Sequence, residues 1–143
     1  MTQPLYTVRQ VAYVVRDMEK ALKYWTEYLK VGPFFVLEHA PLENQKYRGG
    51  ASNADISIAL GNSGDVQIEL IYSENDAPSV YKEFLDAGKT GVHHFGMMPE
   101  NFEETCREYA ARGHEAAFEC TVGGAPLVYF DTVDSVGHFI ELW

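Results

Sequence analysis

The 143-residue chain carries 21 acidic and 11 basic side chains, and its formal net charge of -10 would repel a nucleic-acid backbone or an anionic membrane. We therefore expect neither as a partner. Because 46% of the residues are apolar, the composition is that of a globular protein, and the length predicts a single domain spanning residues 1–143.

Two cysteines, Cys106 and Cys120, lack the close spacing of a thiolate metal site or a disulfide framework. They are typical of buried thiols in a reducing compartment. The N-terminal residues show no basic leader followed by an apolar core, and no apolar stretch approaches membrane-spanning length. These features predict a cytoplasmic protein.

The first half of the chain predicts one helix and four strands. A helix capped by Asp17 is indicated by an apolar face made of Met18, Ala21, Leu22, Trp25 and Leu29. In chain order we expect a strand at 6–15, the helix at 16–30, a strand at 34–39, a polar loop at 40–50, and strands at 54–60 and 65–72 around a hairpin turn at 61–64.

The second half predicts the same order of elements. After a short linking helix at 76–88 come a strand at 90–98, a helix at 100–113 closed by Gly113, and strands at 114–121, 125–132 and 137–143, with a turn at 133–135. An offset of 84 aligns Gln10 with His94 and Asp17 with Asn101. Each half has an apolar sheet face that it cannot hide alone.

This internal duplication predicts an α+β fold in which two βαβββ modules form a curved mixed sheet with a cleft. We expect module one at residues 5–74, a linker at 75–89 and module two at 90–143.

Four polar residues occupy equivalent places in the first and last strands of the two modules: Gln10, Glu69, His94 and Glu141. Glu69 and Glu141 each stand between Ile and Leu, whose side chains must point to the opposite face of the sheet. Taken alone, either glutamate is more typical of the solvent side of an edge strand, and it is the coincidence of four equivalent positions that favours a shared site. If all four point into the cleft, one nitrogen and three oxygen donors converge as a shell for a divalent ion. His93 is expected on the outer face or behind the ligands.

The βαβββ duplication, the HHFG strand and the paired IEL strands resemble the vicinal oxygen chelate superfamily, which includes glyoxalase I, methylmalonyl-CoA epimerase, extradiol dioxygenases and antibiotic-resistance proteins. The resemblance covers essentially the whole chain. It implies that Gln10, Glu69, His94 and Glu141 are metal ligands, and this set looks most like the shell of zinc-type glyoxalase I. It also implies a homodimer.

The departures from the family patterns narrow the expected chemistry. Extradiol dioxygenases hold iron with two His and one Glu, whereas the first strand here offers Gln10. The epimerases differ at two positions of the shell. The residues that grip glutathione in glyoxalase I are replaced here by Val14, Ser73 and Thr90. The resemblance therefore implies related chemistry on a different, less anionic substrate.

The expected chemistry is proton transfer next to a carbonyl. A divalent ion stabilises the enolate that forms when the neighbouring carbon loses its proton, and a carboxylate beside the metal can take that proton. We predict Glu141 as the principal base and Glu69 as the second catalytic carboxylate. Zinc, nickel, cobalt and manganese all accept such donors, so the sequence leaves the metal open.

The predicted substrate-binding residues suggest an apolar or aromatic substrate. Arg48, beside Lys46 in the polar loop, is expected to receive a substrate carboxylate or phosphate, although ordinary loop polarity explains it equally well. The others are Ala12, Tyr47, Tyr72, Gly96, Met98, Phe139 and Trp143.

The leading hypothesis is a metal-dependent lyase or isomerase acting on a small molecule. A glutathione-dependent lactoylglutathione lyase and a non-catalytic, resistance-type binding protein are the alternatives.

Overall fold

The computed structural model describes residues 7–143, which form ten strands, four helices and one π-helical segment. Residues 5 and 6, at the start of the predicted first module, lie outside the described residues. The strands are β1 (Val8–Val15), β2 (Phe35–Leu37), β3 (Leu42–Tyr47), β4 (Gly50–Ala51), β5 (Ile56–Ser63), β6 (Val66–Ser73), β7 (Val92–Met97), β8 (Ala116–Val122), β9 (Ala125–Phe130) and β10 (Phe139–Leu142). The helical elements are α1 (Met18–Lys23), η1 (Tyr24–Tyr28), α2 (Val80–Asp86), α3 (Phe102–Ala111) and α4 (Val133–Val136).

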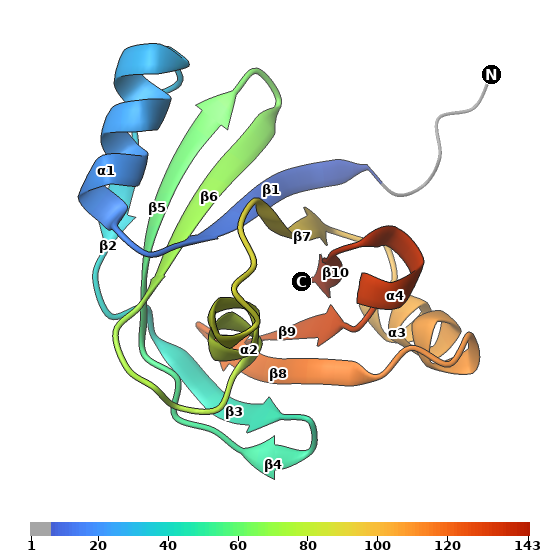
Figure 1. The fold of residues 1–143 in the computed structure, drawn as a ribbon. Helices are drawn as coiled ribbons and strands as arrows, with labels where there is room; N and C mark the ends of the chain where they lie inside the picture. Colours follow the sequence, from blue (N-terminus) through green and yellow to red (C-terminus); the bar gives the residue numbers. More distant parts are fainter. Residues whose placement is uncertain (1–6) are drawn as a thin grey trace, which may run out of the picture.

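All ten strands belong to one curved sheet in the order β2-β5-β6-β1-β7-β10-β9-β8-β3-β4 (Figure 1). Within each half, the first strand pairs in parallel with the last, β1 with β6 and β7 with β10. The two halves meet where β1 and β7 pair antiparallel. This half-barrel confirms the predicted fold class, two βαβββ modules in a curved mixed sheet.

The equivalent helices begin in the same way. Asp17 caps α1 by accepting a hydrogen bond from the Lys20 amide, as predicted, and Asn101 caps α3 by accepting one from the Glu104 amide. Asp17 and Asn101 are the pair that the offset of 84 aligned. The duplication therefore extends to the capping side chains.

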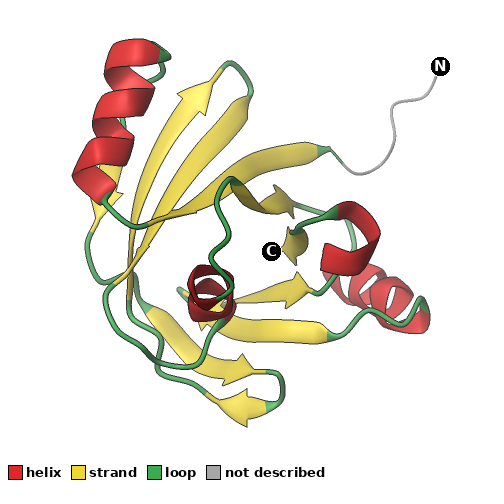
Figure 2. Ribbon diagram, in the orientation of Figure 1, coloured by secondary structure: helices red, strands yellow, loops and turns green. Residues whose placement is uncertain are grey.

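Side-chain alternation divides each central strand between two environments. On β1, Val11, Tyr13 and Val15 pack outward against α1 and η1, whereas Ala12 and Val14 face the concave side. In the second half, α3 covers the outer face of β9 and β10 (Figure 2). The concave face is therefore the one that both modules share.

The linking helix α2 lies within the curve of the sheet (Figure 1). Val80, Tyr81 and Phe84 pack in one cluster with Ala12 from module one and Phe118 from module two. The predicted helical linker thus fills part of the cleft and contributes to the core of both halves.

The first helix departs from the predicted apolar face at Leu29, which is 44% exposed. The chain widens into the π-helical segment, where the Leu29 amide bonds the Tyr24 carbonyl five residues earlier. The extra residue rotates Leu29 away from the sheet, while Met18, Ala21, Leu22 and Trp25 stay packed.

Residues 40–50 are not the predicted polar loop, because most of them form the β3–β4 hairpin. β3 pairs with β8 and so extends module two with residues from module one. Leu42 and Tyr47 pack against the concave core, which holds the hairpin in place. The turn between β5 and β6 lies at Gly64 and Asp65, later than expected, because the strands pair as far as Ser63 and Val66.

Candidate metal centre

Four neighbouring strands at the middle of the sheet, β6, β1, β7 and β10, bring the predicted ligands together. The Nε2 atom of His94 lies 3.0 Å from Gln10 Oε1, 3.5 Å from Glu69 Oε2 and 3.3 Å from Glu141 Oε2. All four side chains are buried. The structure therefore places one imidazole and three side-chain oxygen groups around one point on the concave face.

Gly96 makes room for this cluster. A Cβ atom at Gly96 would collide with the Trp143 ring and would lie 3.0 Å from Gln10 Oε1. The predicted residues Gly96 and Trp143 thus pack together beside the ligands, and any larger side chain at position 96 would displace one of its neighbours.

A pocket of about 320 Å³ opens onto the centre. Its walls include Gln10, Glu69 and Glu141, and the remainder is mostly apolar. Within the described residues, no Lys or Arg lines it. The other lining residues are Leu37, Ala40, Pro41, Leu42, Ile56, Ile58, Gln67, Tyr81, Val122, Ala125, Pro126, Leu127, Tyr129 and Trp143.

Comparison with known proteins identifies the family. Residues 9–130 match the family model of the Glyoxalase/Bleomycin resistance protein/Dioxygenase superfamily, which is the vicinal oxygen chelate superfamily. The chain belongs to this superfamily. The matched segment contains Gln10, Glu69 and His94, and β10 adds Glu141 beyond it.

Solved structures share this fold at low sequence identity. A hypothetical protein from Bacillus halodurans is 18% identical with a TM-score of 0.65, and the match covers 96% of this chain and 92% of that one. Methylmalonyl-CoA epimerase from Mycobacterium tuberculosis is 19% identical with a TM-score of 0.62, covering 99% and 90%. A variant of the Streptomyces coelicolor epimerase in complex with 2-nitronate-propionyl-CoA is 13% identical with a TM-score of 0.62, covering 94% and 91%. A search of curated proteins finds no match. In residues 7–143, no helix has both the length and the apolar character needed to cross a membrane.

The electrostatics of the four-residue cluster follow from its burial. Burial raises the pKa of Glu69 to about 8; the neighbouring His94 lowers it and the charge of Glu141 raises it. Burial alone would lower the pKa of His94, but the charge of Glu141, its hydrogen bond and the charge of Glu69 raise it. Two carboxylates therefore compete for one imidazole.

The donor set fits a divalent ion by its chemistry. Within residues 7–143, no group of three or more His, Cys, Asp or Glu side chains is arranged as a ready metal site. However, ligands about 2.1 Å from a common ion lie roughly 3.0–3.4 Å from one another, close to the separations around His94 Nε2. A divalent cation would also balance the two carboxylates. The four residues that would hold it are Gln10, Glu69, His94 and Glu141.

The structure places the other predicted substrate-binding residues away from the pocket. Ala12 is fully buried beneath the ligands, and Phe139 is buried in the core on the far side of His93. Tyr72 borders a separate shallow depression beside Lys82. Met98 is 57% exposed. Their roles in substrate binding stay predictions that this geometry does not support.

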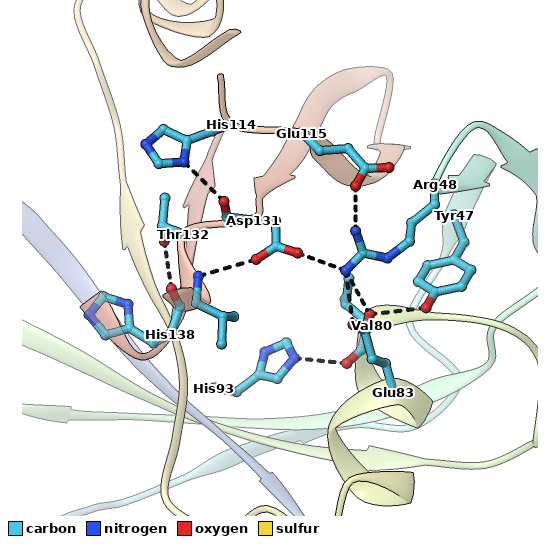
Figure 3. A network of polar contacts seen from close by, with 11 residues as sticks. Tyr47, Arg48, Val80, Glu83, His93, His114, Glu115, Asp131, Thr132 and His138 are labelled. Atoms are coloured by element: carbon cyan, nitrogen blue, oxygen red, sulfur yellow. Dashed lines mark hydrogen bonds and ion pairs between the residues drawn. The ribbon is translucent and has the colours of Figure 1, made fainter. Parts of the chain in front are cut away.

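Arg48 and Tyr47 belong to a polar network that holds the hairpin to the rest of the molecule (Figure 3). Arg48 donates to Glu83 and Asp131 at 2.8–3.1 Å and also to Glu115, while the Tyr47 hydroxyl donates to Glu83 at 3.0 Å. Burial alone would lower the pKa of Arg48, but the hydrogen bonds to Asp131 and Glu83 raise it. The guanidinium is thus occupied by three carboxylates and does not face the pocket.

Sequence reasoning missed several residues at the site. Tyr81 comes from the linking helix and Tyr129 from β9; both line the pocket, and their hydroxyls lie 3.0 Å apart. Tyr129 lies directly opposite Glu141 in the antiparallel pair of β9 and β10, and residues directly opposite share one face of the sheet. Pairing the two predicted strands could therefore have indicated Tyr129 as a residue of the site. Gln67, which accepts a hydrogen bond from Gln10 Nε2 at 2.8 Å, also lines the pocket.

We predict that the metal-free protein loses stability as the pH rises. The pKa of Glu69 is raised from 4.5 to about 8 in the folded state, so its full contribution is present below pH 4.5 and disappears as the pH approaches 8. The loss should be on the order of a few kcal/mol, measured by urea unfolding in chelator-treated protein across this range. Glu69→Gln should flatten the profile, and Glu119→Gln, at an exposed site on β8, should not. An equal slope in Glu69→Gln would contradict this prediction.

We also predict that Arg48→Met lowers the free energy of unfolding by about 2–4 kcal/mol, because three carboxylates would lose their shared partner. Urea unfolding measures the change, with Lys46→Met, at an exposed residue of β3 two positions before Arg48, as the control. If Arg48→Met left stability intact but weakened substrate binding, the role of an anion anchor would be restored.

Proposed function

We propose that the protein is a divalent-metal-dependent isomerase or lyase that moves a proton on the carbon next to a carbonyl group of a small, uncharged, apolar substrate. The observation that carries the proposal is the convergence of four donors from four adjacent strands at the mouth of a largely apolar pocket. Superfamily membership and the epimerase fold neighbours are consistent with an isomerase.

The pocket walls support the choice of substrate. Leu42, Ile58 and Leu127 offer apolar contacts, and Trp143 offers an aromatic surface near the ligands. The one arginine predicted to receive an anion, Arg48, is already paired. A substrate with a carboxylate or phosphate would therefore find no cationic side chain among the lining residues, whereas a neutral ketone or aldehyde would leave no charge unpaired.

The chain's own side chains divide the work of proton transfer. A bound metal would supply Lewis-acid stabilisation of the charge that develops on the carbonyl oxygen. Glu141 and Glu69 come from different modules and approach His94 from opposite sides, on β10 and β6, so one can remove a proton and the other can return it. We assign Glu141 as the principal base. The pocket around them is largely apolar, which strengthens each electrostatic interaction.

The ligand set supports a glyoxalase-like centre within this proposal. Gln10 and Glu69 occupy the positions at which the set differs from the shell expected for an epimerase. A homodimer and a cytoplasmic location belong to the same proposal.

Metal content is the first test. Protein purified without chelator should contain about one divalent ion per chain by elemental mass spectrometry, because the four donors would be used together. His94→Ala should lose most of it, whereas His114→Ala should keep it, since His114 bonds the Asp131 carbonyl away from the centre. A wild-type protein that stays metal-free after reconstitution with zinc, nickel, cobalt and manganese would remove the enzyme proposal in favour of a binding protein.

Proton exchange tests the chemistry. We expect the metal-loaded protein to catalyse exchange of the protons next to the carbonyl of phenylacetone in D₂O, followed by NMR. Glu141→Gln should slow this exchange roughly 100- to 10,000-fold, because it removes the base. Glu119→Gln should leave it unchanged. Equal exchange in wild type and Glu141→Gln would contradict the assignment of the base.

Turnover of the hemithioacetal of methylglyoxal and glutathione in parallel would instead support the alternative, a lactoylglutathione lyase. No turnover at high enzyme concentration would exclude it.

A further inference from the structure

We propose that His93 is a positioning residue that fixes a hydrogen of His94 on Nδ1, so that Nε2 is the nitrogen of His94 that faces the candidate metal centre. Its link to a metal rests on the proposed function, whereas the hydrogen-bond arrangement itself does not.

His93 lies inside the molecule rather than on the outer face. It is 1% exposed, and the pairing of β1 with β7 shifts register between Ala12 and Tyr13, which allows both His93 and His94 to point inward. Four aromatic rings surround the His93 ring, with centroids 5.1–6.0 Å away: Tyr81, Phe84, Tyr129 and Phe139. Because packing holds the ring in place, its two nitrogen atoms make hydrogen bonds in fixed directions.

The hydrogen bond between His93 and Val80 determines the tautomer of His93. Its Nε2 atom lies 3.1 Å from the Val80 carbonyl oxygen at the start of α2 (Figure 3). A carbonyl oxygen can only accept, so His93 Nε2 carries the hydrogen. In a neutral imidazole the other nitrogen, Nδ1, is then an acceptor.

The second hydrogen bond determines which nitrogen of His94 is the donor. The Nδ1 atoms of His93 and His94 lie 3.0 Å apart, so His94 Nδ1 must be the donor. The other nitrogen of His94, Nε2, faces acceptor oxygens of Gln10, Glu69 and Glu141, so it carries a hydrogen in the metal-free protein and would give up that hydrogen to bind a metal. A metal-binding histidine requires this arrangement, with its other nitrogen donating to a fixed acceptor.

The opposite assignment would bury an uncompensated charge. If His93 were doubly protonated, its two bonds would still run only to Val80 and His94 among the described residues, with no carboxylate at either ring nitrogen. Burying an unpaired cation among aromatic rings is costly. The neutral ring that donates to Val80 is therefore the consistent state.

Gln10 is oriented in a parallel way. Its Nε2 donates to Gln67 Oε1, so its Oε1 faces His94 Nε2 at 3.0 Å. In the metal-free protein the hydrogen on His94 Nε2 lies among the oxygens of Gln10, Glu69 and Glu141, and a bound cation would take its place. Two hydrogen bonds thus connect the linking helix to the candidate metal centre, from the Val80 carbonyl to His93 and from His93 to His94.

Nitrogen NMR tests the tautomers directly. Long-range ¹H–¹⁵N spectra of the imidazoles should show the hydrogen of His93 on Nε2 and a hydrogen of His94 on Nδ1, in metal-free and in zinc-loaded protein. A hydrogen on His93 Nδ1 in either sample would overturn the proposal. Because the metal-free spectrum suffices for this result, a wild-type protein that binds no zinc would remove the proposed function without deciding the role of His93.

Three variants separate positioning from simple packing. His93→Phe fills the aromatic site without a nitrogen, His93→Gln carries its amide near the Nε2 position beside Val80, and His93→Asn carries its amide near the Nδ1 position beside His94. Zinc affinity, measured by competition with a chromophoric chelator, should fall roughly 10- to 100-fold in His93→Phe and His93→Gln. His93→Asn should recover most of it, because an acceptor for His94 is restored. Near-ultraviolet circular dichroism confirms that each variant is folded; folded Phe and Gln variants with wild-type affinity would overturn the proposal.

Discussion

The candidate site depends on the antiparallel pairing of β1 with β7. This seam joins the two halves and sets Ala12 opposite His94 and Gln10 opposite Gly96, with Glu69 and Glu141 on the strands that flank it. Because successive side chains alternate between faces, a shift of one residue in the seam would send the ligands of one half to the outer surface. The apolar residues that face α1, such as Val11 and Tyr13, oppose such a shift. The packing of β1 against α1 on the outer face of the sheet thus determines which side chains face the candidate metal centre on the concave face.

This arrangement has an electrostatic cost, because it buries two carboxyl groups. Glu69 and Glu141 are buried beside a single imidazole, and burial raises the pKa of Glu69 to about 8, so without a cation the folded chain keeps Glu69 largely protonated at neutral pH. A neighbouring cluster shows the opposite solution, since Arg48 is shared by carboxylates from three other segments. One network is complete without a ligand and holds the fold together. In the other network Glu69 lacks a cationic partner that keeps it ionised at neutral pH, and the cluster opens onto the pocket, as expected of a functional site.

The sequence was sufficient to predict the duplicated fold and the four residues that converge, because both rest on repeat equivalence. Gln10 aligns with His94 at a fixed offset, and Glu69 and Glu141 share the same apolar neighbours. Features that break the repeat escaped prediction. The β3–β4 hairpin is an insertion in module one that pairs with module two, and residues 40–50 are mostly polar because only Ala40, Leu42 and Tyr47 among them pack against the core.

The sequence left His93 either on the outer face or behind the ligands, because strict alternation assigns neighbours to opposite faces and a register shift cannot be seen in one sequence. Most pocket residues come from elements that no repeat relates, so their proximity follows only from the packed structure. Tyr81 illustrates this point: its helix was predicted, but nothing in the linker indicated that the helix lies inside the curve of the sheet.

The position of α2 has a consequence for the order of folding. Tyr81 and Phe84 are made before residues 92–142 of the chain, yet they pack against Phe118, Tyr129 and Phe139, which come later. A nascent first module would therefore leave two large aromatic side chains without their partners until the second module is complete. The buried linker adds contacts of long sequence separation, which are slow to form because loop closure precedes any gain from packing. Although the two halves are repeats, they are expected to reach the native state as one cooperative unit.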